Sequence, residues 1–217
     1  MKTIILIRGK KRAGKDTIAE KLYGNLPVRV KAKILSFAEP MKDILADTFE
    51  VNKETIEVAK NEPYLHPIKM VQLREDVDYN RIHTDMRRVL QNFGQAVKKH
   101  FGQAVWADLL YSKLEENTVH IVSDWRYIIE YEALRDRPDV RIITLKVYNE
   151  DVDNSDTHSS EVELDEHTDT TYTINNSKDH RKYVDINLDE FIRETRISMP
   201  DFRHPDPLDY FKCAKVW

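Results

Sequence analysis

The sequence predicts an α/β fold built on a parallel sheet with helices on both faces. An apolar run at residues 2–8 leads through a glycine-containing turn into a helix-forming segment at about 15–24. Four later apolar runs alternate with helical stretches, and they lie at about 30–37, 119–124, 140–147 and 172–174. Strands that alternate with helices favour parallel pairing, because each parallel connection needs a crossover segment such as a helix.

Helices are expected between these strands, at about 39–49, 84–101, 104–116, 127–136 and 179–196. The polar stretch 51–80 contains Pro63 and Pro67 and is typical of irregular structure or short helices. The most regular helix is 84–101, where apolar residues recur at three- and four-residue steps: Met86, Val89, Leu90, Phe93, Val97 and Phe101.

The length of 217 residues suits a single α/β domain with an inserted subdomain. We expect this domain to cover residues 1–217, with its core at about 1–50 and 117–196. A helical insertion is expected at about 51–116 and a lid at about 149–169.

Charge, hydropathy and cysteine content narrow the class of protein. The formal net charge of −4 means that the chain has no overall excess of basic residues for binding nucleic acid. No apolar run reaches the roughly 18 residues of a membrane span, and the run at 1–7 breaks at Arg8 without a signal-peptide cleavage site. Cys213 is the only cysteine, which excludes an internal disulfide and fits a reducing compartment. We therefore expect a cytoplasmic protein without a membrane or nucleic-acid partner.

The turn after the first strand has the spacing of a phosphate-binding loop, G-x-x-x-x-G-K. Gly9 and Gly14 let backbone N–H groups surround phosphate oxygens, and the following helix presents its positive end to the same anion. Lys15 can reach the β- and γ-phosphates of ATP as a point charge. The predicted ATP-binding residues are Gly9, Lys10, Ala13, Gly14, Lys15, Asp16 and Thr17.

One position departs from this pattern, because Asp16 follows the lysine where Ser or Thr is usual, and Thr17 comes after it. A carboxylate there can hold Mg²⁺ or orient the second substrate. The alternative is that Asp16 only favours the positive end of the helix, which stabilises it by less than about 1 kcal/mol.

A second carboxylate is expected near the loop, because the buried strand 119–124 ends in Asp124. Ligands gather at the carboxyl ends of parallel strands, so Asp124 would hold Mg²⁺, and Arg126 would emerge beside the phosphates. Glu130 could orient the Arg126 guanidinium from the next turn. The alternative is a surface salt bridge worth well under about 1 kcal/mol.

The helix 84–101 also carries a polar stripe, formed by Arg87, Gln91, Gly94 and Lys98. Arg87 could bind a monophosphate bidentately, Gln91 could bond a base edge, and Gly94 would leave room for close approach. A polar helix face is more commonly just solvated. Trp106 could stack on a base, although core packing is the commoner use of tryptophan.

Seven motifs occur in an order that resembles a known family. They are Gly-Lys-Lys-Arg-Ala-Gly-Lys-Asp-Thr (9–17), Ser-Phe-Ala-Glu-Pro-Met-Lys (36–42), Arg-Arg-Val-Leu-Gln-Asn-Phe-Gly (87–94), Trp106, Asp-Trp-Arg-x-x-x-Glu (124–130), His-Ser-Ser-Glu (158–161) and Thr-Ile-Asn (173–175). The series covers most of residues 1–176 and resembles the bacteriophage-type deoxynucleoside monophosphate kinases of the P-loop nucleoside monophosphate kinase superfamily.

The resemblance implies the nucleoside-monophosphate-kinase fold, with ATP as donor, Mg²⁺ as metal and a deoxynucleoside monophosphate as acceptor. Lys15, Asp16 and Arg126 would be catalytic, and Asp16 and Thr17 would hold the metal together with Asp124. The residues that would bind the acceptor are Ser36, Lys42, Arg87, Gln91, Trp106, Asp124, Arg126 and Glu130.

Two features depart from the family. Lys98 and Lys99 stand where an arginine is expected, which gives up bidentate geometry. The lid-like stretch 149–169 has no Lys or Arg, whereas such kinases usually close a basic lid over the donor phosphates. Another arginine would then have to neutralise the phosphate charge: Arg126, Arg135, Arg137 or Arg141. His158 is better read as an exposed loop histidine than as a catalytic one.

Three other functions stay open. A kinase of another phosphorylated metabolite, for instance phosphomevalonate, would use the same scaffold. A non-catalytic nucleotide-binding module would bind ATP without transfer, and a nucleic-acid-processing enzyme would need a basic stripe that is absent here. The aromatic tail 198–217 could pack on the body or on a second subunit, so a homodimer also stays open.

Overall fold

The computed structural model describes residues 1–61, 86–152, 163–164 and 170–197. The chain divides into two compact units, and each is described by itself. The first unit comprises Met1–Ile34, Leu114–Arg126 and Arg137–Trp217, and the second comprises Leu35–Lys113 and Tyr127–Asp136.

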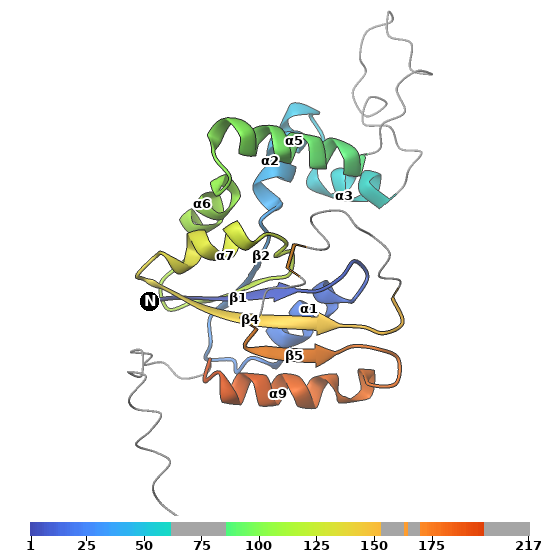
Figure 1. Ribbon diagram of the computed structural model, residues 1–217, viewed down its shortest axis with the longest axis vertical. Coiled ribbons are helices and arrows are strands. Elements are labelled where there is room, and N and C mark those ends of the chain that lie inside the picture. Colours follow the sequence, from blue (N-terminus) through green and yellow to red (C-terminus); the bar gives the residue numbers. More distant parts are fainter. Residues whose placement is uncertain (62–85, 153–162, 165–169, 198–217) are drawn as a thin grey trace, which may run out of the picture. The chain divides into compact units, whose positions relative to one another are not determined.

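The first unit is organised by a five-stranded sheet with the order β2-β3-β1-β4-β5 (Figure 1). The strands are β1 (Lys2–Arg8), β2 (Ala32–Leu35), β3 (Val119–Val122), β4 (Val140–Tyr148) and β5 (Tyr172–Asn175). β1 pairs in parallel with β3 and β4, and β4 pairs in parallel with β5. Because β1 is central, its Ile4–Ile7 run is fully buried, as expected for a strand covered on both faces.

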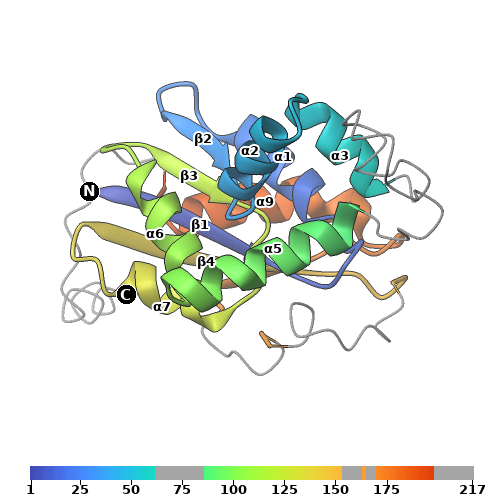
Figure 2. The same cartoon turned by 90° about the horizontal axis from the view of Figure 1, so that it is seen from above.

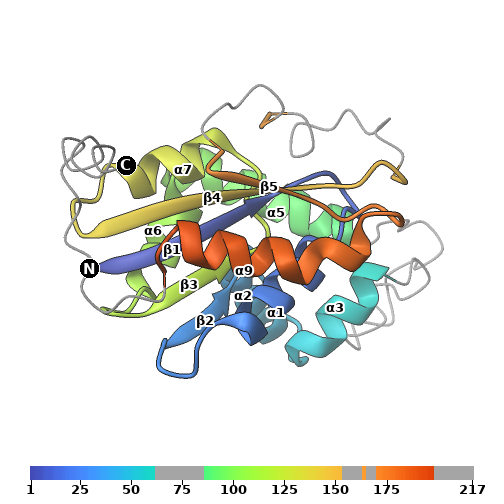
Figure 3. The same ribbon diagram turned by 90° about the horizontal axis from the view of Figure 1, so that it is seen from below.

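Two helices pack together against one face of this sheet, α1 (Lys15–Asn25) and α9 (Val184–Glu194) (Figure 3). A short 3-10 turn, η2 (Arg181–Tyr183), precedes α9. The helices and strands share one apolar cluster, in which Leu22 and Phe191 lie with Ile5 and Ile174. The predicted α/β class with a parallel sheet is therefore confirmed.

The second unit is helical. Its elements are α2 (Glu39–Thr48), α3 (Lys53–Asn61), α5 (Met86–Phe101), α6 (Val105–Ser112) and α7 (Ile128–Arg135). α2, α3 and α5 pack against one another, and α6 contacts both α5 and α7 (Figure 2). Leu45, Ile56, Met86 and Leu90 form the apolar centre of the first group. α3 lies within the stretch for which the sequence predicted irregular structure or short helices.

The buried side of α5 differs from the predicted stripe. Met86 and Leu90 are buried as expected, but the buried side continues through Gly94 and Lys98, which the sequence placed on a polar face. Phe101, assigned to the apolar stripe, is 78% exposed. The buried residues follow one another at steps of four, which is more than the 3.6 residues of one helical turn. The buried line therefore moves gradually around α5, away from the apolar stripe predicted from the sequence.

Within the residues that the structure describes, no helix is long and apolar enough to cross a membrane.

Candidate functional site

The predicted phosphate loop lies at the carboxyl end of the central strand β1, and its first glycine is required by close packing. Gly9 has φ +155°, and a Cβ added there would lie 2.3 Å from the Val147 carbonyl oxygen of β4. Any side chain at this position would therefore push β4 away from the start of the loop.

The second glycine is fixed by its backbone conformation and by Asn176. Gly14 has φ +92°, where side chains are disfavoured, and a Cβ there would lie 2.2 Å from Asn176 Nδ2. Asn176 is buried, follows β5, and donates a 2.9 Å hydrogen bond from Nδ2 to the Ala13 carbonyl. The last strand of the sheet thus holds the loop in place.

Lys15 folds across the loop that precedes it. Its Nζ donates hydrogen bonds of 2.7 Å to the Gly9 carbonyl and 2.9 Å to the Lys10 carbonyl. Gly14 is the N-cap of α1, and its carbonyl accepts the 2.9 Å bond from Ile18 N that closes the first helical turn. The ammonium and the N-terminal amides of α1 therefore belong to one short segment, an arrangement suited to a polyphosphate.

The carboxylate at the unusual position has a defined partner. Asp16 Oδ1 accepts a 2.6 Å hydrogen bond from Ser123 Oγ, and Ser123 directly follows β3. Ser123 is 8% exposed, whereas Asp16 and Thr17 are both exposed. The loop therefore presents a carboxylate of fixed orientation beside a hydroxyl.

The oxygen atoms of Asp16, Thr17 and Asp124 are the hard ligands that Mg²⁺ prefers. Asp124 follows Ser123 and is half-buried. The described part of the chain contains no group of three or more His, Cys, Asp or Glu side chains that could hold a metal. A Mg²⁺ ion bound here would thus take its remaining ligands from phosphates and water, as is usual for this ion.

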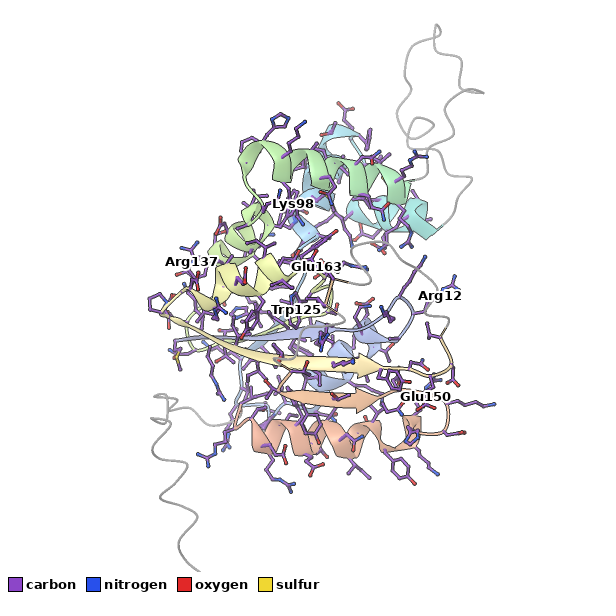
Figure 4. All side chains as sticks on the ribbon, viewed as in Figure 1. Arg12, Lys98, Trp125, Arg137, Glu150 and Glu163 are labelled. Atoms are coloured by element: carbon purple, nitrogen blue, oxygen red, sulfur yellow. The ribbon has the colours of Figure 1, made fainter. Side chains whose placement is uncertain are left out.

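Two of the arginines suggested as substitutes for a basic lid lie at the wrong end of the sheet. Arg141 pairs in register with Thr3, five residues before Arg8, and its guanidinium donates a 2.7 Å bond to the Thr195 carbonyl. Five strand residues span roughly 16 Å. Figure 4 shows Arg137 and Arg12 at opposite ends of the first unit. Arg137 and Arg141 are therefore removed from the candidates, because both lie at the amino end of β4.

Arg12, by contrast, belongs to the loop. It is exposed, and its backbone has φ +65°. Lys11 beside it is exposed and Lys10 is half-buried, so three consecutive cations lie in the loop. Arg126 is half-buried. It is the last residue of the Leu114–Arg126 segment of the first unit and follows Asp124 by two residues.

The predicted acceptor residues Ser36, Lys42, Arg87 and Gln91 lie in the second unit. Ser36 Oγ accepts a 3.1 Å bond from Ala38 N at the start of α2. Lys42 Nζ forms a 2.7 Å ion pair with Glu57 of α3. Burial acts to raise the pKa of Glu57, but hydrogen bonds from Lys42 and Lys60 outweigh it and lower that pKa.

Arg87 and Gln91 lie on α5, four residues apart. Arg87 is half-buried and Gln91 is exposed. Neither side chain is hydrogen-bonded or ion-paired within the described parts of the chain.

Three other predicted residues of the second unit, Gly94, Trp106 and Glu130, are buried. Trp106 is 5% exposed, and a Cβ at Gly94 would lie 4.0 Å from its Nε1 and 3.2 Å from Met41 Sδ. Gly94 therefore makes room for side chains of its own unit, and core packing accounts for the burial of Trp106. Glu130 is 4% exposed, and its Oε2 accepts a 3.1 Å bond from Tyr127 N at the start of α7.

Lys98, where an arginine was expected, is 6% exposed and lies with Nζ 3.4 Å from the centre of the Tyr127 ring. A desolvated ammonium over an aromatic ring is stabilised by a cation–π interaction. Lys98 thus joins α5 to the segment that begins α7.

Sequence reasoning missed Ser123 and Asn176, the two residues that hold the loop. Both follow directly after a strand at the carboxyl end of a parallel sheet, where ligand sites form, and that position was the available signal. The motif His-Ser-Ser-Glu (158–161), most of the predicted lid and the tail 198–217 with Cys213 lie outside the described residues.

Comparisons with known proteins give little further information. No protein-family model matches the chain, and no curated protein does either. Among solved structures, the unliganded crystal structure of a sugar kinase from Janibacter sp. HTCC2649 matches with a TM-score of 0.39 and 11% sequence identity. The match covers 94% of this chain and 99% of that chain. A likeness this distant does not assign an activity.

Proposed function

We propose that the protein is a phosphotransferase that moves the γ-phosphoryl group of ATP to a deoxynucleoside monophosphate. The observation that carries the proposal is the loop 9–17, in which two glycines, the folded-back Lys15 and the start of α1 form one segment suited to binding phosphate. The choice of acceptor follows from the family resemblance of the sequence and from Arg87 and Gln91 on α5, which have no hydrogen-bond or ion-pair partner among the described residues.

In this proposal the first unit binds the donor. Backbone amides of the loop and of the first turn of α1 bind the phosphates, and Lys15 neutralises charge on the transferred group. Arg126 stabilises the same charge from the end of the β3 segment. Mg²⁺, when held by Asp16, Thr17 and Asp124, would supply further neutralisation of the phosphate oxygens.

The acceptor residues come mainly from the second unit. Arg87 offers a planar guanidinium for bidentate binding of a monophosphate, and Gln91 lies one helical turn further along α5. Ser36, Lys42, Trp106 and Glu130 stay predicted contributors. No general base is needed, because a nucleoside monophosphate is already largely ionised near neutral pH.

The deciding experiment measures ADP formation from ATP against a panel of acceptors. The panel contains the common deoxynucleoside monophosphates, the matching ribonucleotides, phosphomevalonate and a water-only control. We expect turnover with at least one deoxynucleoside monophosphate and none with phosphomevalonate. Turnover with phosphomevalonate alone would favour the metabolite kinase, and ATP binding without any turnover would favour the non-catalytic module.

Two substitutions test the assigned catalytic cations. We expect Lys15→Ala and Arg126→Ala each to lower kcat by more than about 100-fold, the scale of losing one key charge-stabilising group. Lys33→Ala and Arg193→Ala serve as matched controls. Lys33 lies on β2 and Arg193 on α9, and both side chains are exposed and form ion pairs outside the loop. Near wild-type turnover in a folded Lys15 or Arg126 variant would remove that residue from the mechanism.

A further inference from the structure

The phosphate loop carries a carboxylate, Asp16, where the common loop has a hydroxyl, and a hydroxyl at the end of β3 donates a hydrogen bond to it. In the common phosphate loop a Ser or Thr hydroxyl follows the lysine, and a carboxylate comes from a neighbouring strand. Here the carboxylate of Asp16 follows the lysine, and the Ser123 hydroxyl follows β3 and donates the 2.6 Å bond to Oδ1. Asp124 keeps a carboxylate on the strand side as well, so the segment carries one more negative charge than the common loop.

The hydrogen bond fixes one oxygen of Asp16 and leaves the other for a ligand. Ser123 is almost fully buried at the end of a buried strand, so its hydroxyl is a rigid donor. Asp16 is exposed, and no described residue donates a hydrogen bond to its Oδ2. The carboxylate is therefore oriented by the protein but not neutralised by it.

This charge has opposite consequences for free ATP and for ATP that carries a divalent cation. A carboxylate in the first turn of α1 repels the phosphates of free ATP and weakens the positive end of the helix. A divalent cation reverses the sign, because carboxylate and phosphate oxygens can both bind it.

We propose that Ser123 is a positioning residue that holds Asp16 as a selector for metal-bound nucleotide. The loop accepts the ATP–Mg²⁺ complex and disfavours metal-free ATP more strongly than a loop with a neutral hydroxyl at position 16 would. This inference rests on the proposed function, because it requires ATP as the ligand.

The test measures binding rather than turnover. Calorimetric titrations with ATP, in MgCl₂ and separately in EDTA, give two dissociation constants without any acceptor. For the wild-type protein we expect metal-free ATP to bind more weakly by about tenfold or more. Asp16→Asn keeps an oxygen acceptor for Ser123 but removes the charge, so the ratio should fall towards one, mainly through tighter binding of metal-free ATP.

The Ser123 variants separate positioning from folding. Ser123→Ala should shrink the ratio, and Ser123→Thr, which keeps the hydroxyl, should restore it. Asp185→Asn is the matched acid control, because Asp185 is an exposed carboxylate of α9 paired with Lys21, and it should leave both constants unchanged. If Ser123 only supported the fold, both constants would rise together and the ratio would persist.

Three outcomes decide the matter. Equal binding of ATP with and without Mg²⁺ in the wild type, together with phosphoryl transfer in the acceptor panel, would overturn this inference and leave the proposed function standing. A ratio unchanged by Asp16→Asn would do the same, even if neither Ser123 variant folded. Failure of the wild type to bind ATP under either condition would overturn both.

Discussion

Gly14 shows how much of the candidate site depends on one backbone position. Its φ of +92° and the 2.2 Å approach of Asn176 Nδ2 to a Cβ are two separate obstacles to a side chain. We expect Gly14→Ala to lower the free energy of unfolding by at least about 1 kcal/mol and to abolish ATP binding. Urea unfolding and calorimetric titration with ATP measure the two effects.

Gly24, in the same helix α1, is the matched control for this substitution. It has no positive φ, and nothing lies within 4 Å of a Cβ added there. Gly24→Ala should leave ATP binding unchanged and raise the free energy of unfolding by up to about 1 kcal/mol, since alanine favours a helix over glycine. Equal effects of the two substitutions would contradict the assigned role of Gly14.

At the scale of residues, the sequence predicted the loop but not the residues that hold it. Gly9 and Lys15 lie only six positions apart, with Gly14 between them, so their spacing could be read directly. Asn176 lies 163 positions from Ala13, and Ser123 lies 107 positions from Asp16. Such contacts are set by the order of strands in the sheet, which a single sequence does not contain.

Helix α5 offers a comparison between two apolar residues that the sequence treated alike. Leu90 is 6% exposed within the apolar centre of the second unit, whereas Phe101 is 78% exposed at the end of the helix. We expect Leu90→Ala to cost about 2–5 kcal/mol of unfolding free energy. Phe101→Ala should change it by no more than about 0.5 kcal/mol. Chemical denaturation of both variants measures the difference, and a large loss for Phe101→Ala would contradict the observed burial.

The strand β3 contains a fully buried histidine whose protonation should destabilise the fold. The Nδ1 of His120 lies 3.2 Å from the Thr3 carbonyl oxygen, and its Nε2 accepts a 3.1 Å bond from Glu115 N. Burial lowers the pKa of His120 below its ordinary value of 6.5. The unfolded chain therefore takes up a proton at a higher pH than the folded protein does.

The sign of the pH effect follows from this lowered pKa. The stability contributed by neutral His120 is complete above pH 6.5 and is lost as the pH falls from there through the folded-state pKa. We expect the wild type to lose more unfolding free energy than His120→Gln between about pH 7.5 and 5.5. Urea unfolding at both pH values measures this, and parallel losses would contradict it.

At the scale of elements, the alternation of strands and helices was sufficient to predict the α/β class. The burial of individual helix faces was not, because it depends on partners. Gly94 and Lys98 look polar or neutral in the sequence, yet Met41, Trp106 and Tyr127 cover them. Apolar periodicity finds a helix more reliably than it finds which side is buried.

For the whole molecule, nucleotide binding should appear as a gain in stability. A ligand at 100 times its dissociation constant adds about 2.7 kcal/mol to the free energy of unfolding if it binds only the folded state. We expect a non-hydrolysable ATP analogue with Mg²⁺ to raise Tm, and to slow hydrogen exchange most at the amides of residues 9–18. Lys15→Ala should lose both effects, and protection centred elsewhere would move the donor site away from the loop.

The division of the chain into two units was harder to predict than its fold. The sequence placed a helical insertion at about 51–116, whereas the second unit begins at Leu35 and also takes in Tyr127–Asp136. No change in composition marks the passage from Arg126 to Tyr127, where the chain leaves the first unit in the middle of the Asp124–Glu130 motif.

The tether from Asn176 to the loop has a consequence for synthesis of the protein. The chain is made from its N-terminus, so the glycine turn leaves the ribosome long before the strand that secures it. We expect a nascent polypeptide stopped before residue 176 to be unable to retain ATP, although it would already contain every residue of the loop. A premature stop codon upstream of this position should therefore yield an inert product rather than a weakened enzyme.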